Sequence, residues 1–506
     1  MSWGERLGLP GLGSAAWRGT AGRGRTGLGT LGMGRLAVDG GQLARWRAGR
    51  AWFTNGLLVV FGVALLGLTR QFVAEHERFR IGFSGASGWS LWMYAAAMVV
   101  VLTGPVNRWT IWIVLGFAVA FRVVTLRAEP FLSSDIYRYV WDGIVQHAGI
   151  SPYRYVPGNP VLTFLRGPHQ EIFDNINRRD YAVTIYPPAA QMVFWLATMV
   201  SPTVGAMKLV MFGFECVTAG ALVALLRLMG RRSTDVLVYA WCPLLVWEIG
   251  GAGHVDAVVF GFVTLAMLFR YREQPVPTGV FLGLAVMTKF YPLVLLPALW
   301  RRGDWKMPAT VAAVCAAGYA VYSSAGRMVF GFLAGYQKEE GLESGARFFL
   351  LEWAQRFAGL RGVGTAVYKV FCVAVLGAIA VWAWRYASTE RLGAEARVGR
   401  PAFVTASAAM AFAMMLLFSP HYAWYLAWLV PLLALAPNVP MLVYVCAFFY
   451  GFTTQWADPG PKMFLLNEWM YAVVGVGIVV GVVLWRWPVG RWFDLRGGGE
   501  GFWRVR

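Results

Sequence analysis

Two carboxylates, Asp135 and Asp142, stand in residues 133–157, shortly after the apolar run of residues 109–126. An ionisable side chain at the centre of a bilayer costs about 2.5 to 3.5 kcal/mol, so charge placed just beyond a hydrophobic run indicates work at the membrane surface. The stretch also contains five tyrosines and tryptophans and two prolines, which favours an ordered interfacial segment over an ordinary solvated loop. We therefore predict that residues 133–157 form an active-site loop at the membrane surface.

Three further clusters of polar residues stand at the ends of different apolar runs. They contain His254 and Asp256 in Gly-His-Val-Asp, Lys289 and Tyr291 in Lys-Phe-Tyr-Pro, and His421 and Tyr425 in Ser-Pro-His-Tyr-Ala-Trp-Tyr. A carboxylate flanked by lysine, histidine and arginine suits the transfer of a group from a lipid phosphate. The cations would stabilise the phosphate as it leaves, and the carboxylate would accept the proton of the attacking hydroxyl. Sugar transfer with inversion makes the same demands, with a base opposite the leaving group.

Several of these residues also have a purely structural interpretation. His254 and His421 could be core histidines that bind neighbouring carbonyl groups. His254 and Asp256 lie two residues apart, a spacing that does not place both on one helix face, so a shared metal ion is not expected. Lys289 could simply extend its amine to the membrane surface.

For the remaining charged residues the structural interpretation is preferred. Asp142 stands four residues after Arg138, the spacing at which two helical side chains pair. We expect Asp142 to orient that arginine. The acidic run of Glu339, Glu340 and Glu343 is predicted to be solvated.

The composition identifies a membrane protein. Of the 506 residues, 58% are hydrophobic and only 14% are charged, and the apolar runs are long enough to cross a bilayer. The runs are continuous rather than alternating, so the spans are helices and not barrel strands. The five cysteines all fall inside apolar runs without metal-ligand spacing, and we expect them to be packing residues. The sequence predicts an all-α polytopic protein with about 12 to 14 transmembrane helices.

Fourteen hydrophobic helices are expected, at residues 52–69, 89–103, 109–126, 204–228, 234–250, 255–269, 277–288, 290–300, 308–324, 365–384, 402–418, 422–436, 439–455 and 469–485. Two of them, 277–288 and 290–300, are too short for a hydrocarbon core of roughly 30 Å and predict a re-entrant hairpin with Lys289 at its outer tip. The run of residues 186–200, counted as a span, would invert every later loop against the Lys/Arg bias. We expect it to be an extracytoplasmic interfacial helix with Pro187 and Pro188 in its first turn.

The distribution of basic residues predicts the domain organisation. Residues 1–50 are rich in Gly and contain eight arginines, which indicates a cytoplasmic tail able to contact anionic lipid. Residues 51–490 form the transmembrane domain, with large extracytoplasmic loops at 127–203 and 325–364, and residues 491–506 form a second cytoplasmic tail. The net charge of +19 therefore reflects topology, and no nucleic-acid partner is expected.

The motifs of this chain follow one another in a characteristic order. In sequence they are Arg122, Ser-Ser-Asp135-Ile-Tyr-Arg-Tyr-Val-Trp-Asp-Gly, Gly-Ile-Ser-Pro-Tyr, Tyr186-Pro-Pro, Gly-His254-Val-Asp, Lys289-Phe-Tyr-Pro and Ser-Pro-His421-Tyr. Over residues 109–425 this order resembles the GT-C superfamily of polyprenyl-phosphate-sugar-dependent glycosyltransferases. The closest resemblance is to bacterial α-mannosyltransferases that build phosphatidylinositol mannosides and related lipoglycans.

The resemblance implies a site and a fold. Asp135 would be the catalytic aspartate of the first large extracytoplasmic loop, and Arg122 the arginine that precedes it. A lipid-linked donor would enter sideways from the membrane, beside interfacial helices. The chain departs from the family in placing two helices and an arginine-rich tail before residue 109. Candidate substrate-binding residues are Arg122, Tyr137, Arg138, Asp142, Tyr186, His254, Asp256, Lys289, Tyr291, His421 and Tyr425.

The predicted function is the transfer of a hexose, with mannose the expected sugar, from a polyprenyl phosphate to a lipid or glycan hydroxyl. The transfer is expected to invert the anomeric configuration. The site would face the extracytoplasmic side of the inner (plasma) membrane and need no cofactor or metal ion. Asp135 would act as the base, and Lys289 with His421 or Arg122 would contact the phosphate. The alternatives are a polytopic transporter or lipid flippase, for which matching sequence halves would be expected, and a non-catalytic assembly partner.

Overall fold

The computed structural model describes residues 40–75, 80–130, 132–345, 348–390, 400–457 and 463–486. The chain separates into two units, Met1–Trp46 and Arg47–Arg506, and apart from residues 40–46 the features below belong to the second. Most of the predicted N-terminal tail, residues 1–39, and the whole of the predicted C-terminal tail, residues 491–506, lie outside the described residues.

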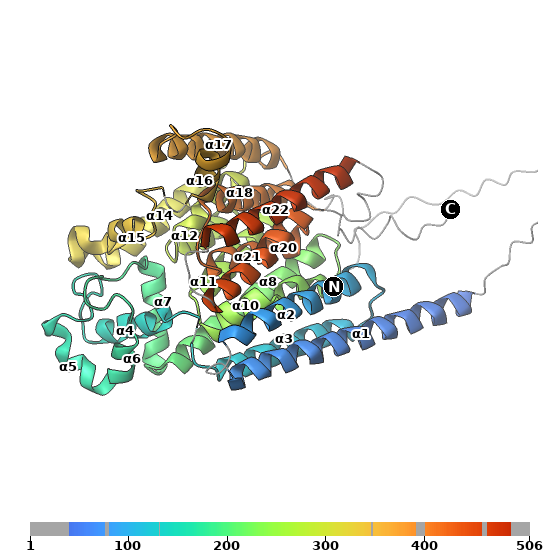
Figure 1. The fold of residues 1–506 in the computed structure, drawn as a ribbon, viewed down its shortest axis with the longest axis horizontal. Helices are drawn as coiled ribbons and strands as arrows, with labels where there is room; N and C mark the ends of the chain where they lie inside the picture. Colours follow the sequence, from blue (N-terminus) through green and yellow to red (C-terminus); the bar gives the residue numbers. More distant parts are fainter. Residues whose placement is uncertain are drawn as a thin grey trace, which may run out of the picture. The chain divides into compact units, whose positions relative to one another are not determined.

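Every regular element in the described residues is a helix, which confirms the all-α prediction (Figure 1). The longer helices are α1 (Gly40–Glu75), α2 (Arg80–Thr103), α3 (Thr110–Leu126), α4 (Asp135–His147), α7 (Pro188–Val200), α8 (Val204–Leu228), α11 (Asp256–Tyr271), α12 (Pro275–Val286), α14 (Lys306–Val321), α17 (Thr365–Ala387), α18 (Ala402–Phe418), α21 (Val439–Ala457) and α22 (Met463–Arg486). The shorter ones are η1 (Pro160–Leu162), α5 (Thr163–Arg166), η2 (Gly167–His169), α6 (Gln170–Asp174), η3 (Ser233–Val236), α9 (Leu237–Ala240), α10 (Pro243–Leu245), η4 (Val246–Gly251), η5 (Tyr291–Leu295), α13 (Leu296–Leu299), η6 (Ser323–Phe330), α15 (Leu333–Glu339), α16 (Phe349–Phe357), α19 (Trp424–Ala427) and α20 (Leu429–Leu435).

Several helices suit a membrane. In the described part of the chain, Ala48–Val73, Val204–Leu228 and Thr365–Ala387 are long and apolar enough to cross one, and two sharply bent helix pairs raise the number from 3 to 5 if each is one span. Eight shorter apolar helices accompany them. The chain is therefore a multi-pass membrane protein, and the larger number of spans expected from the sequence stays a prediction.

The prediction of a single helix at residues 234–250 is wrong. The segment is instead divided into η3, α9, α10 and the π-helix η4, and the stretch Pro243–Gly251 is bent by 120° relative to α11. Pro243 has no N–H to donate to a preceding turn, and Gly253, with a φ of 73°, adopts the left-handed conformation that glycine tolerates best. The break places His254 and Asp256 inside the protein, where both are almost fully buried.

The loop expected at residues 133–157 is also wrong in its first half, which forms helix α4. Residues 138–145 of this helix are all buried, its two charged side chains at 138 and 142 included. Their burial follows from the neighbours of α4, which packs against α6, α7 and α8. A search for long apolar runs overlooks such a helix, because its charged residues interrupt the hydrophobic pattern.

Close packing between α4 and α7 fixes the orientation of α4. α7 begins as expected, with Pro188 in its first turn, where a missing N–H does no harm. At the crossing, a Cβ atom on Gly143 would overlap Thr198 Oγ1 and lie 2.6 Å from the Phe194 carbonyl oxygen. Only a residue without a side chain lets the two helices come this close.

We expect Gly143→Ala to destabilise the protein by about 1 to 3 kcal/mol, the usual effect of forcing an extra methyl group into a packed interface. Gly213→Ala on α8 is the matched control, since its Cβ would meet nothing within 4 Å. Thermal unfolding of the purified proteins in detergent measures both. Equal melting temperatures for Gly143→Ala and the parent would contradict the close approach of α4 and α7.

Candidate active site

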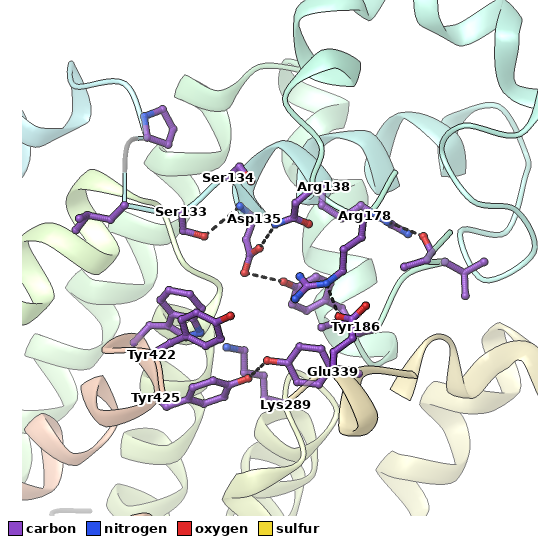
Figure 2. A pocket seen from close by; sticks show the side chains of 18 of the residues that line it. Ser133, Ser134, Asp135, Arg138, Arg178, Tyr186, Lys289, Glu339, Tyr422 and Tyr425 are labelled. Carbon is purple, nitrogen blue, oxygen red and sulfur yellow. Dashed lines mark hydrogen bonds and ion pairs between the residues drawn. The ribbon is translucent and has the colours of Figure 1, made fainter. Parts of the chain in front are cut away.

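A cavity of about 660 Å³ opens beside the first residue of α4 (Figure 2). This volume lies within the range of small-molecule sites in proteins. Its walls come from segments that are far apart in the sequence. They are Pro130, Leu132, Ser133, Ser134, Asp135 and Arg138, then Asn177, Arg178, Tyr181, Ala182, Val183, Ile185 and Tyr186, then Lys289, Tyr336, Glu339, Tyr422, Trp424 and Tyr425.

Asp135 is held by neutral hydrogen-bond donors. Asn177 Nδ2 donates to its Oδ1 at 2.8 Å, and the Tyr186 hydroxyl donates to its Oδ2 at 3.4 Å. Its own N–H donates to the Ser133 hydroxyl at 3.2 Å. Asp135 is the first residue of α4, where the positive end of the helix dipole stabilises a carboxylate. Among the described residues it forms no ion pair, so its negative charge stays available inside the cavity.

Tyr186 is well suited to its contact with Asp135. Burial of the side chain and the nearby negative charge of Asp135 raise the pKa of its hydroxyl well above the usual value. The hydroxyl therefore keeps its proton and acts as a donor. It also lies 3.4 Å from the Tyr139 hydroxyl, so a pair of buried phenols stands behind the carboxylate.

Arg138 presents one unpaired nitrogen atom. Its Nε donates to Asp142 at 2.7 Å and its Nη1 to the Ala182 carbonyl at 3.0 Å, while Gln191 Nε2 donates to the other Asp142 oxygen at 2.9 Å. The pairing of Arg138 with Asp142 confirms the structural interpretation of that carboxylate. Nη2 is buried and has no partner among the described residues. A buried donor without a partner is unfavourable, and the Arg138 residue that carries it lines the cavity.

Lys289 follows α12 in the turn before η5 and reaches the cavity from a second side. Its Nζ lies 2.6 Å from Asp256 Oδ2, and the Tyr291 hydroxyl donates to Oδ1 at 2.8 Å. The amine also lies 5.4 Å from the centre of the Tyr425 ring, within the range of a cation–π contact. Asp256 and Tyr291 therefore orient the lysine but do not line the cavity themselves.

A third cation, Arg178, closes another side of the cavity. Its Nε forms an ion pair with Glu339 Oε2 at 2.7 Å, and its side chain remains 27% exposed. Burial would lower the pKa of Arg178, but the hydrogen bond and charge of Glu339 and the charge of Asp135 raise it above its usual value. The residue has a φ of 54°, an uncommon conformation outside glycine that costs on the order of 1 to 3 kcal/mol and is concentrated at functional sites.

The acidic run near residue 340 is not simply solvated. Glu339 lines the cavity and binds Arg178, and Glu340 is buried. Both are held by α15 and the turn that follows it, which bring Tyr336 against the hydroxyl of Tyr425. The expectation of a solvated charge run is therefore wrong for Glu340, which is buried, whereas Glu339 is exposed as expected and also binds Arg178.

The structure brings together five of the twelve candidate residues in the cavity wall, namely Asp135, Arg138, Tyr186, Lys289 and Tyr425. Asp142, Asp256 and Tyr291 lie behind them and hold the two cations. His254 is buried and stacks on Trp424, with its Nε2 3.3 Å from Glu248. Tyr137, His421 and Arg122 do not line the cavity.

Arg122 has a structural environment instead. Its Nη2 lies 2.7 Å from Glu215 Oε1, its Nη1 donates to the Ala240 carbonyl, and both charged side chains are buried. The pair joins α3 to α8. Such a pair holds helices together and leaves no donor directed into the cavity.

Sequence reasoning missed Asn177, Arg178, Tyr336, Glu339, Tyr422 and Trp424. Tyr422 and Trp424 stand in the same motif as His421 and Tyr425, so their aromatic character was a usable signal. Nothing in the sequence connects Asn177 to Asp135, which precedes it by 42 residues. In the described part of the chain, no group of three or more His, Cys, Asp or Glu side chains could hold a metal ion.

Two family models match the chain across this site. Residues 16–301 match the N-terminal domain of alpha-(1->6)-mannopyranosyltransferases, which is more than half of the chain. The chain belongs to this family. Residues 184–420 also match Glycosyltransferase family 87. The two ranges together contain Asp135, Asn177, Lys289 and Glu339. No curated protein and no solved structure was found to match.

The family confirms the resemblance deduced from the motifs. As a member of the alpha-(1->6)-mannopyranosyltransferase family with many apolar helices, the chain is a membrane glycosyltransferase. A sugar donor and an acceptor follow from that class of reaction. The cavity around Asp135 is the place in the described structure where the cations, the carboxylate and the aromatic side chains meet.

The position of Arg122 gives a testable distinction between a structural and a ligand-binding role. Glu215→Leu should destabilise the protein by about 3 to 5 kcal/mol, because it leaves a buried arginine without its partner. Replacing both residues, Arg122→Met with Glu215→Leu, should restore most of the stability and leave donor use intact. Thermal unfolding and a sugar-transfer assay measure the two effects.

The exposed pair of Arg356 and Glu352 is the control, with side chains 54% and 31% exposed. Removing it should change stability by no more than about 1 kcal/mol. If the double variant at positions 122 and 215 is stable but no longer uses the donor, Arg122 contributes to donor binding and its role is not structural alone.

Proposed function

We propose that this protein transfers a hexose, most simply mannose, from a polyprenyl phosphate to a hydroxyl group of a lipid or glycan, with inversion at the anomeric carbon. The observation that carries the proposal is the charge arrangement of the cavity. Arg138, Arg178 and Lys289 each form an ion pair with a carboxylate. Asp135, in contrast, forms no ion pair with a cation among the described residues. A free carboxylate beside three fixed cations suits a base next to an anionic leaving group.

The proposed reaction is a single displacement. The acceptor oxygen attacks the anomeric carbon and loses its proton to Asp135, while the bond from that carbon to the phosphate oxygen breaks and its electrons remain on the phosphate. A sugar hydroxyl is a poor nucleophile at neutral pH, so a base within hydrogen-bond reach accelerates the attack. Polyprenyl phosphate leaves as a stable anion and needs no acid. One carboxylate therefore suffices where an inverting glycosidase uses two.

The cations would bind the phosphate of the donor. Lys289 and Arg138 both belong to the cavity wall, and each side chain is fixed by a buried carboxylate. Preorganised donors of this kind stabilise developing charge without having to reorient during the reaction. The candidate contacts Arg122 and His421 are not carried into this proposal, because neither lines the cavity.

We place the site on the extracytoplasmic side of the plasma membrane. The support is the Lys/Arg bias of the loops, which assigns both termini and the short connections to the cytoplasm. Helix α7 would lie in the membrane surface beside the cavity, since Leu196, Met199 and Val200 at its C-terminal end are 55%, 63% and 87% exposed. A lipid-linked donor could then reach the cavity from the membrane.

The decisive variant is Asp135→Asn, which keeps the size of the side chain but removes the base. Transfer should fall by on the order of 10² to 10⁴, the usual contribution of general base catalysis, while donor binding survives. The assay is transfer of radiolabelled mannose from a synthetic polyprenyl phosphate to membrane glycolipids by purified protein in detergent. Asp180→Asn, at a side chain that is 77% exposed, is the control and should keep full activity.

This assay also tests the transporter alternative, because detergent abolishes vectorial transport but permits chemistry. Parent protein that binds the donor and never releases polyprenyl phosphate would favour a transporter or flippase. Full transfer by Asp135→Asn would remove Asp135 from the mechanism.

Lys289→Met should weaken donor use by roughly ten- to a hundredfold, since a lost charge-assisted contact is worth about 1.5 to 3 kcal/mol. The variant also leaves Asp256 buried without its cation, which lowers stability. The double variant Lys289→Met with Asp256→Asn removes this second effect, so it should regain stability and still use the donor poorly. Lys338→Met, on the exposed side of α15, is the control. Normal kinetics for Lys289→Met would show that the lysine serves the fold alone.

A further inference from the structure

A stack of three aromatic rings ends at one wall of the cavity. Tyr422 and Trp424 stack with their centroids 4.4 Å apart and their planes 8° from parallel. Trp424 in turn stacks on His254, at 4.3 Å and 25°. Tyr422 and Trp424 line the cavity, whereas His254 is almost fully buried behind them. The stack therefore runs from the protein interior to the cavity and ends in the Tyr422 ring.

The inner rings hold the outer ring in place. Trp424 is only 8% exposed, and His254 is buried beside Glu248, with 3.3 Å between Nε2 and Oε2. The chain enters this segment through Ser419, whose φ of 44° marks a left-handed turn at the end of α18. Tyr422 lies in the short stretch between that turn and α19. An aromatic face fixed in this way loses little conformational freedom when a ligand stacks on it.

The opposite side of the cavity is polar. Figure 2 shows Tyr422, Tyr425 and Lys289 on one side, and Asp135, Arg138 and Arg178 on the other. A pyranose ring has polar hydroxyl groups around its edge and a face formed by C–H groups. A ligand of this kind matches a cavity with a flat aromatic wall opposite a carboxylate and an arginine, with a lysine at the edge of the aromatic wall.

We propose that Tyr422 is the platform on which the transferred pyranose rests, backed by Trp424 and His254. The inference rests on the proposed function and names the part of the site that recognises the sugar, separately from the phosphate. The C–H face of the pyranose would lie on the tyrosine ring, and this contact would orient the anomeric carbon toward Asp135. Tyr422 is thus a substrate-binding residue, and Trp424 and His254 are positioning residues that act through it.

Equilibrium binding of two lipids separates a sugar platform from a phosphate contact. The ligands are radiolabelled polyprenyl-phosphate mannose and polyprenyl phosphate without sugar. Tyr422→Ala should weaken binding of the mannosylated lipid by about ten- to a hundredfold, in line with stacking on an aromatic ring, and change binding of the sugar-free lipid less than about twofold. Tyr422→Leu, which keeps apolar bulk without a flat ring, should resemble Tyr422→Ala. Tyr422→Phe should retain most of the parent's affinity.

Tyr386→Ala is the matched control. Tyr386 also stacks on a tryptophan, Trp382, at 5.3 Å and 8°, but on α17 and outside the cavity. Its loss should alter neither binding constant. Equal weakening of both lipids by Tyr422→Ala, or full affinity in Tyr422→Leu, would overturn the platform.

The failure of this proposal can be told from the failure of the proposed function. Parent protein that transfers mannose normally, together with an unaffected Tyr422→Ala variant, would remove the platform alone. Parent protein that binds both lipids equally and transfers no sugar would remove both proposals.

Discussion

The pairing of buried charges is the constraint on which the rest of this site depends. An unpaired ion in an apolar interior is strongly unfavourable, and three cations at or behind the cavity wall are each held by a buried carboxylate. The pairs are Arg122 with Glu215, Arg138 with Asp142, and Lys289 with Asp256. The partly exposed pair of Arg178 and Glu339 follows the same pattern. This pairing fixes the three cations around the cavity and leaves Asp135, which only neutral donors contact, as its uncompensated charge.

The site is built where helices begin, end or break. Asp135 opens α4, Lys289 follows α12, His254 and Asp256 lie at the bend before α11, and Tyr422 follows the left-handed end of α18. In a membrane protein, irregular backbone at such places is tolerated when it lies against protein or a polar cavity, because its amide groups then find partners. Polar chemistry and irregular backbone therefore gather at one place, while the regular apolar helices form the surroundings.

The arrangement separates the tasks of a sugar transfer. Under the proposed function, the cations bind the phosphate, the stacked rings bind the sugar, and Asp135 activates the acceptor. Each cation arrives with its charge already balanced, so the donor would be recognised through hydrogen-bond geometry and shape more than through net attraction. Helices α4 and α7, which meet at Gly143, position the carboxylate relative to this binding wall.

The sequence by itself determined the class of the protein and several of the residues that line the cavity. Long apolar runs can only be buried as helices in a membrane, and the motif order identified the glycosyltransferase family and the carboxylate Asp135. The i,i+4 pairing of Arg138 with Asp142 was also predictable, because helix geometry alone sets that distance. Only the tertiary structure decided that α4 is a buried helix and that Arg122 pairs with Glu215 on α8. It also decided which distant residues line the cavity, namely Asn177, Arg178, Glu339 and Tyr422. These residues meet Asp135 or its neighbours across dozens to hundreds of positions, and no local pattern records a contact that exists only once the helices have packed.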